Sequence, residues 1–134
     1  MTKLATIEGI GPVYQQKLEE AGIKSIEALR AACATPKGRE ELAAKSEISP
    51  KLILEWANRA DLFRVKGIAE EYSDLLEAAG VDTVVELSKR NGENLYAKVK
   101  EVNAGKKLVR KLPSLDQVKD WIEQAKALPR GMSY

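Results

Sequence analysis

The chain has 134 residues, 44% hydrophobic and 31% charged, which is enough length and apolar content for a globular fold. Its 22 basic and 20 acidic residues leave a net charge of +2, which alone does not indicate a nucleic-acid partner. The absence of histidine excludes Ser-His-Asp and Cys-His catalysis and every metal site that contains histidine. The single cysteine, Cys33, excludes an internal disulfide and a four-cysteine metal site. The absence of a long apolar run and of a signal-peptide pattern predicts a cytoplasmic protein.

The sequence repeats itself at a shift of 58 residues. Residues 7–29 align with residues 65–87, and eight of the 23 pairs are identical. A repeat of this length predicts two similar structural units, which we place at residues 1–64 and 65–134. We expect the two units to form one compact, pseudo-symmetric body.

Each repeat predicts the same succession of elements. Tyr14, Leu18 and Ala21 are spaced to lie on one face of a helix, and their counterparts 58 residues later have the same spacing. Gly22 suits the left-handed position after that helix, and Ser25 suits the N-cap of the next one. Each unit therefore begins with a glycine turn, a helix, a glycine stop and a second helix.

The remaining segments carry helix-start signals as well. These are Thr35-Pro36, Ser49-Pro50, Asn91 and the capping-box pattern Ser114–Gln117. Trp56 and Trp121 fall in the last amphipathic helix of each unit, where we expect both to anchor the core. Strand patterns are nearly absent, so the sequence predicts an all-α protein of about eight short helices.

The turn Gly9-Ile10-Gly11, with an apolar residue between two glycines, resembles the hairpin of the helix-hairpin-helix superfamily. The motifs Ile7-Glu-Gly-Ile-Gly-Pro and Leu18-Glu-Glu-Ala-Gly-Ile resemble DNA-repair and recombinase N-terminal domains. Gly22–Leu29 is similar to part of the RNA polymerase α C-terminal domain. The whole chain resembles an uncharacterised bacterial domain-of-unknown-function family with two such hairpins. The resemblance implies two fused, SAM-like units around one core.

The first hairpin, residues 7–12, is a candidate phosphate site. A glycine turn that leads into a helix N-terminus exposes N–H groups suited to a phosphate. The resemblance implies backbone contacts from Gly9, Ile10, Gly11 and Val13, sometimes bridged by a monovalent cation, and no other cofactor. Gln15 departs from the family pattern, which has a small residue there. The alternative is a turn that serves packing alone.

The second hairpin, residues 65–70, departs further from the family pattern. Ala69 replaces the second glycine, and Glu70 and Glu71 place negative charge where a phosphate would arrive. Carboxylates stabilise a helix N-terminus but repel an anionic ligand. We therefore expect the second hairpin to be purely structural.

A basic segment, residues 98–111, contains six cationic side chains and one acidic residue. The cations are Lys98, Lys100, Lys106, Lys107, Arg110 and Lys111. Such a cluster can neutralise several phosphates, and we assign the last four residues to a nucleic-acid contact. The alternative is a solvated surface, in part paired with the acidic stretch 66–86.

Two function hypotheses follow. The first is a non-enzymatic protein that binds DNA backbones without sequence preference through the first hairpin and the basic segment. The second is a protein–protein interaction or structural module that has lost phosphate binding. We predict no catalytic residues, metal ligands, membrane contact or small-molecule substrate, and a buried, unreactive Cys33.

Overall fold

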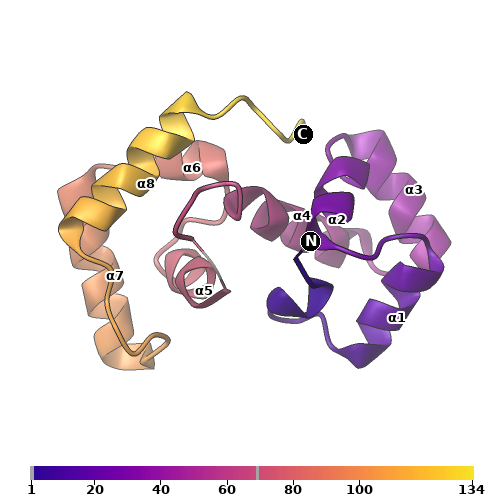
Figure 1. Ribbon diagram of the computed structural model, residues 1–134, viewed down its shortest axis with the longest axis horizontal. Helices are drawn as coiled ribbons and strands as arrows, with labels where there is room; N and C mark the ends of the chain where they lie inside the picture. The colour runs from indigo at the N-terminus through magenta and orange to yellow at the C-terminus, as the bar shows by residue number, and fades with distance from the viewer. Residues whose placement is uncertain (1, 69) are drawn as a thin grey trace. The chain divides into compact units, whose positions relative to one another are not determined.

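The computed structural model describes residues 2–68 and 70–134, with the backbone alone of Glu70 (Figure 1). Within these ranges every regular element is helical, and there are eight α-helices and one short 3₁₀-helix, η1. The all-α prediction of about eight helices is therefore confirmed.

The chain folds as two compact units. Unit 1 comprises Met1–Asp61 and Arg130–Tyr134, and unit 2 comprises Leu62–Pro129. Unit 1 contains η1 (Leu4–Thr6), α1 (Pro12–Glu20), α2 (Ile26–Ala32), α3 (Pro36–Ser46) and most of α4 (Pro50–Leu62). Unit 2 contains α5 (Glu70–Ala78), α6 (Val84–Ser88), α7 (Gly92–Lys106) and α8 (Leu115–Ala127).

Five helices begin at side chains that cap them. The capping oxygen accepts a hydrogen bond from the N–H three residues later, which satisfies one of the unpaired donors of a helix start. These caps are Ser25, Thr35, Thr83, Asn91 and Ser114. At α8 the Gln117 side chain also bonds back to the Ser114 N–H at 2.8 Å, completing the predicted capping box.

The two units repeat their backbone hydrogen bonds as well as their sequence. The N–H of Ile23 donates to Leu18 O at 2.8 Å, and the N–H of Val81 donates to Leu76 O at 2.8 Å. Both bonds pass over a glycine with positive φ, 91° at Gly22 and 93° at Gly80. This is a Schellman ending, and it stops α1 and α5 at matching positions.

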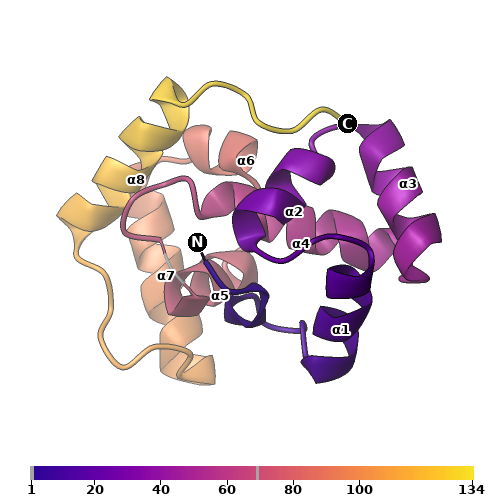
Figure 2. The same ribbon diagram turned by 45° about the vertical axis from the view of Figure 1, so that its right-hand side comes forward.

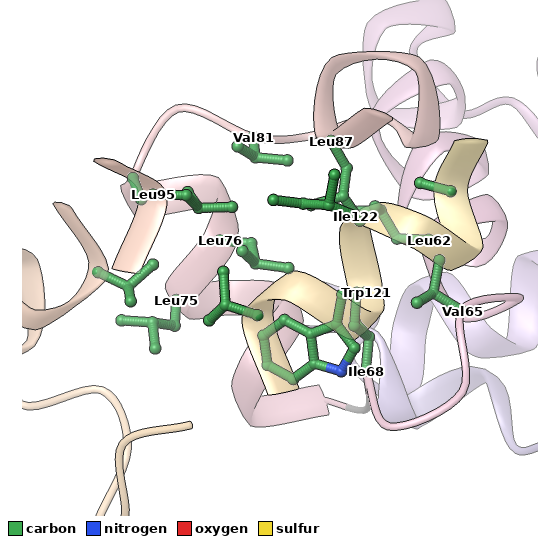
Figure 3. Close-up of a cluster of buried hydrophobic side chains, with 14 of the residues drawn as sticks. Leu62, Val65, Ile68, Leu75, Leu76, Val81, Leu87, Leu95, Trp121 and Ile122 are labelled. Carbon is green, nitrogen blue, oxygen red and sulfur yellow. The ribbon is translucent and has the colours of Figure 1, made fainter. Parts of the chain in front are cut away.

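Unit 2 has one continuous hydrophobic core, to which α8 contributes Trp121 and Ile122 (Figure 3). Helix α8 packs against α6 and α7, as both ribbon views show (Figures 1 and 2). The Tyr72 ring lies 5.3 Å from the Trp121 ring, centroid to centroid, in a tilted contact. Because Trp121 is 2% exposed, its prediction as a core anchor is confirmed.

Unit 1 uses the same aromatic pair. Trp56, on α4, is 3% exposed, and its ring lies 5.1 Å from the Tyr14 ring at an interplanar angle of 66°. Edge-to-face contacts of this kind stabilise beyond the area that they bury. The prediction that Trp56 anchors the core is therefore also confirmed.

The last residues of the chain dock on unit 1 as a short strap. Met132 is buried, and the Ser133 N–H donates to Ala34 O at 2.8 Å. The Tyr134 hydroxyl donates to Asn58 Oδ1 at 2.6 Å, while the Arg39 guanidinium lies 5.5 Å from the tyrosine ring centre. The chain thus returns to its first unit after completing the second.

A hairpin glycine lies against the tryptophan in each unit. Gly9 and Gly67 have φ of 95° and 97°, a conformation that side chains disfavour. A Cβ atom on Gly67 would lie 2.9 Å from Trp121 Nε1, and one on Gly9 would lie 3.4 Å from Trp56 Nε1. Backbone conformation therefore selects glycine at both hairpins, and at Gly67 the space beside the indole selects it as well.

Comparison of two glycines in unit 2 separates these two causes. Gly67→Ala and Gly80→Ala carry the same backbone strain, but only Gly67→Ala presses on an indole ring. We expect Gly67→Ala to lower the free energy of unfolding by about 1–3 kcal/mol more than Gly80→Ala does. Urea denaturation followed by circular dichroism measures both values, and equal losses would contradict the account.

Candidate nucleic-acid interface

The first hairpin connects η1 to α1 and presents its glycines to solvent. The Ile10 N–H donates to Ile7 O at 3.2 Å, and the Ile10 side chain is buried. Ile10 therefore fixes the turn from inside, whereas Gly9 and Gly11 are exposed. Val13, in the first turn of α1, is 68% exposed.

The start of α1 differs from the five side-chain-capped helices. Gly11 is its N-cap and offers no side-chain acceptor, and the first turn contains no acidic residue. Within the described part of the chain, the N–H groups of Gly11, Val13 and Tyr14 have no acceptor. These donors lie at the positive end of the helix dipole, which favours an anion. Glu8, in the same hairpin, is engaged in an interaction of its own.

The segment before η1 is tied to α2. The Thr2 N–H and hydroxyl donate to the Glu27 carboxylate at 3.0 and 2.8 Å, and the Ile26 N–H donates to Thr2 O at 3.0 Å. The Thr2 hydroxyl bond and the neighbouring backbone bonds lower the pKa of Glu27 to about 2. This clamp fixes the path of the chain into the first hairpin.

The second hairpin has the same turn but a different exterior. Ala69 and the side chain of Glu70, which we predicted to disfavour phosphate, lie outside the described residues. Glu71 is described and is exposed in the first turn of α5. The Lys66 backbone is bound on both sides by the Gln124 side chain, which accepts from its N–H at 2.8 Å and donates to its carbonyl at 3.0 Å. The exposed carboxylate of Glu71 thus stands at the helix start where the first unit has Val13.

The basic segment covers the C-terminal half of α7 and the loop that follows it. All six of its cationic side chains are exposed, and none forms an ion pair with a carboxylate among the described residues. Lys107 ends α7 in a left-handed conformation, with φ 50° and ψ 48°. The predicted pairing with the acidic stretch 66–86 is therefore not seen in the described part of the chain.

Specific contacts hold the basic loop, residues 106–111, in place. The Asn103 side chain accepts from the Val109 N–H at 3.0 Å and donates to the Val109 carbonyl at 3.2 Å. The Tyr72 hydroxyl donates to the Lys111 carbonyl at 3.1 Å, and Val109 is buried in the unit 2 core. The four cations of the loop therefore project from a fixed backbone. Sequence reasoning missed Asn103, because its partner lies in an irregular loop.

The predicted site residues lie in two different units. Gly9, Gly11 and Val13 belong to unit 1, together with the inward-facing Ile10. The residues Lys106, Lys107, Arg110 and Lys111 belong to unit 2.

The Cys33 thiol is not a reactive group in this structure. Burial raises the pKa of the Cys33 thiol to about 11, against a smaller opposite effect of Arg39, which leaves the thiol protonated and unreactive at neutral pH.

A cavity of about 380 Å³ is lined by Arg90, Lys119 and Lys126 among others. All three cations have carboxylate partners, at 2.9, 3.8 and 3.4 Å. No group of three or more acidic or cysteine side chains in the described chain could hold a metal ion.

The comparisons with known proteins establish a family. Residues 8–128 match the model of a domain of unknown function (DUF4332), and the chain belongs to that family. No curated protein and no solved structure matches the chain. No helix among the described residues is long and apolar enough to span a membrane.

Removal of the Asn103 amide tests the support of the basic loop. Asn103→Ala leaves the Val109 N–H and carbonyl without their partner, so we expect the free energy of unfolding to fall by about 1–3 kcal/mol. We also expect faster tryptic cleavage after Lys106 and Lys107, followed by mass spectrometry. Asn94→Ala, at an exposed position of the same helix, is the matched control. Equal effects of the two substitutions would refute this role of Asn103.

Proposed function

We propose that this protein is a non-enzymatic helix-hairpin-helix protein that binds the sugar-phosphate backbone of DNA without sequence preference. The observation that carries the proposal is the start of α1, where three N–H groups lack an acceptor among the described residues and no acidic side chain stands in the first turn. A phosphate oxygen is the ligand that best fits such a site. Backbone contacts of this kind position a protein on DNA without reading its sequence.

The turn itself supports the helix-hairpin-helix assignment. Gly9 has positive φ, the apolar Ile10 is buried beneath the turn, and Gly11 begins a helix with Pro12 at its first position. This places the unpaired donors at the surface and the apolar residue in the core. We include in the proposal a monovalent cation between the first hairpin and the phosphate as the only cofactor. We also propose that the protein acts in the cytoplasm.

The basic loop supplies the second contact. Lys106, Lys107, Arg110 and Lys111 are exposed and have no carboxylate partner among the described residues. Each cation that neutralises a phosphate releases a counterion, so affinity should decline steeply with salt. The loop thus adds affinity to the phosphate positioning of the first hairpin.

A second candidate is a protein–protein interaction module. The second hairpin favours it, because the exposed carboxylate of Glu71 in the first turn of α5 disfavours a second phosphate contact of the same kind. Such a module would show no salt-dependent attraction to DNA and would bind a discrete protein partner.

Fluorescence anisotropy with labelled duplex and single-stranded DNA separates the two candidates. For the wild-type protein we expect a micromolar or weaker dissociation constant at about 50 mM salt, and at least a tenfold loss of affinity at about 200 mM. Absence of binding at the lower salt concentration would eliminate the DNA proposal and direct the search to partner proteins.

A double variant tests the named residues. Gly11→Asp places a carboxylate at the N-cap of α1, where it stabilises the helix but occupies the anion site, and Lys106→Glu reverses a loop charge. We expect this pair to abolish measurable binding. The control pair Lys24→Ala and Lys89→Glu, at exposed positions, lowers the net charge by the same amount and should retain most of the affinity. Equal binding by the two double variants would rule out this site.

A further inference from the structure

The strap, residues 130–134, lies on unit 1 in the way that a bound peptide lies on its receptor. It forms no helix, and its partners in unit 1 are distant in sequence. The Ser133 N–H and hydroxyl both donate to Ala34 O, at 2.8 and 3.2 Å. Arg39 and Asn58 contact the strap as well, and together with Ala34 they form what we call the strap site.

Each residue of the strap site binds a different chemical group. Ala34 O, in the turn after α2, accepts from the backbone of an extended segment. Asn58 Oδ1, on α4, accepts from the Tyr134 hydroxyl at 2.6 Å. The Arg39 guanidinium, on α3, lies 5.5 Å from the centre of the Tyr134 ring, within the range of a cation–π contact. The site therefore selects for a backbone donor followed by a hydroxylated aromatic ring.

Contacts within unit 1 hold the strap site in position. The Arg39 guanidinium donates to Cys33 O at 2.9 Å, so its place beside the α2–α3 turn does not depend on the strap. The Thr35 hydroxyl accepts from the Gly38 N–H at 3.1 Å and fixes the start of α3 after the same turn. A surface that is ordered in advance loses little conformational entropy when a ligand binds.

The strap itself is held by few contacts. Met132 is 3% exposed, whereas Arg130, Ser133 and Tyr134 are all exposed, the last by 53%. A segment with few buried apolar contacts opens at a lower free-energy cost than the core on which it lies. The covalent tether compensates, because it holds the strap near its site at an effective concentration on the order of 1 mM. A segment of another chain with the same groups can therefore replace the strap.

We infer that the strap site is a peptide-recognition surface that residues 130–134 close in cis. The partner that fits it is an extended protein segment with an unbranched apolar residue two positions before a tyrosine, as in Met132-Ser133-Tyr134. Methionine suits such a contact because its flexible side chain fills irregular gaps. The inference does not depend on DNA binding. It gives the second candidate function, a protein–protein interaction module, a surface and a class of ligand.

A fluorescein-labelled peptide of residues 126–134 tests the inference on the full chain. Met132→Asp removes the buried apolar side chain of the strap, and Ser133→Pro removes both donors to Ala34 O. We expect either variant to bind the peptide with a dissociation constant of about 0.1–1 mM. The wild-type protein should bind it about fivefold more weakly, or worse, because the tethered strap competes. Fluorescence anisotropy measures all three affinities.

A substitution in the strap site supplies the matched control. Asn58→Ala, added to a strap variant, should weaken peptide binding about fivefold, the usual effect of one lost hydrogen bond. Lys51→Ala, at an exposed position of the same helix, should not. A peptide that carries Met132→Asp and Tyr134→Ala should bind none of the proteins.

The wild-type protein offers a readout that needs no variant. Excess unlabelled peptide should displace the strap, so the Ser133 amide signal in a ¹H–¹⁵N spectrum should move to the position of a disordered residue. A stationary Ser133 signal, equal peptide binding by the wild-type protein and the strap variants, or no binding by a folded strap variant would overturn the inference. None of these results bears on the DNA proposal, which the anisotropy measurement with DNA tests separately.

Discussion

The contact between a tryptophan edge and a hairpin glycine organises each unit. Trp56 approaches Gly9, and Trp121 approaches Gly67, where a Cβ atom on the glycine would lie 3.4 and 2.9 Å from the indole nitrogen. The tyrosine five residues after each glycine packs on the same indole, with ring centroids 5.1 Å apart in unit 1 and 5.3 Å apart in unit 2. Hairpin, following helix and last helix are thereby fixed to one another by a single buried ring. The turn can present its backbone outward because its inner side is held in this way.

The two units have kept this interior and diverged on the outside. The first hairpin opens into an uncapped helix start, whereas the second meets Glu71 and a backbone engaged by Gln124. The second unit also has a longer third helix, α7, than its counterpart α3, and a longer loop after it. That added length carries the basic loop. The N–H groups at the start of α1 and the exposed cations of the basic loop thus belong to different units, and the proposed function uses both.

Local signals in the sequence were sufficient for most of the fold. The caps at Ser25, Thr35 and Ser114 and the glycine stops depend on neighbouring residues only, so a pattern predicts them well. The sequence did not predict the docking of Tyr134 on Asn58 or the two bonds from Asn103 to Val109. These contacts join irregular segments, which have no periodicity to read. The inward position of Ile10 likewise depends on tertiary packing, so the sequence predicted the hairpin motif but not which of its side chains face the core.

The central claim is that one hairpin of the repeat receives phosphate and the other does not. A backbone ¹H–¹⁵N map of the wild-type protein, recorded with and without a short DNA duplex at low salt, tests it most directly. The account predicts shifts at the amides of Gly11, Val13 and Tyr14 and along the basic loop, with Glu71 and Tyr72 unchanged. Shifts at the start of α5, or along the basic loop without the first hairpin, would contradict it.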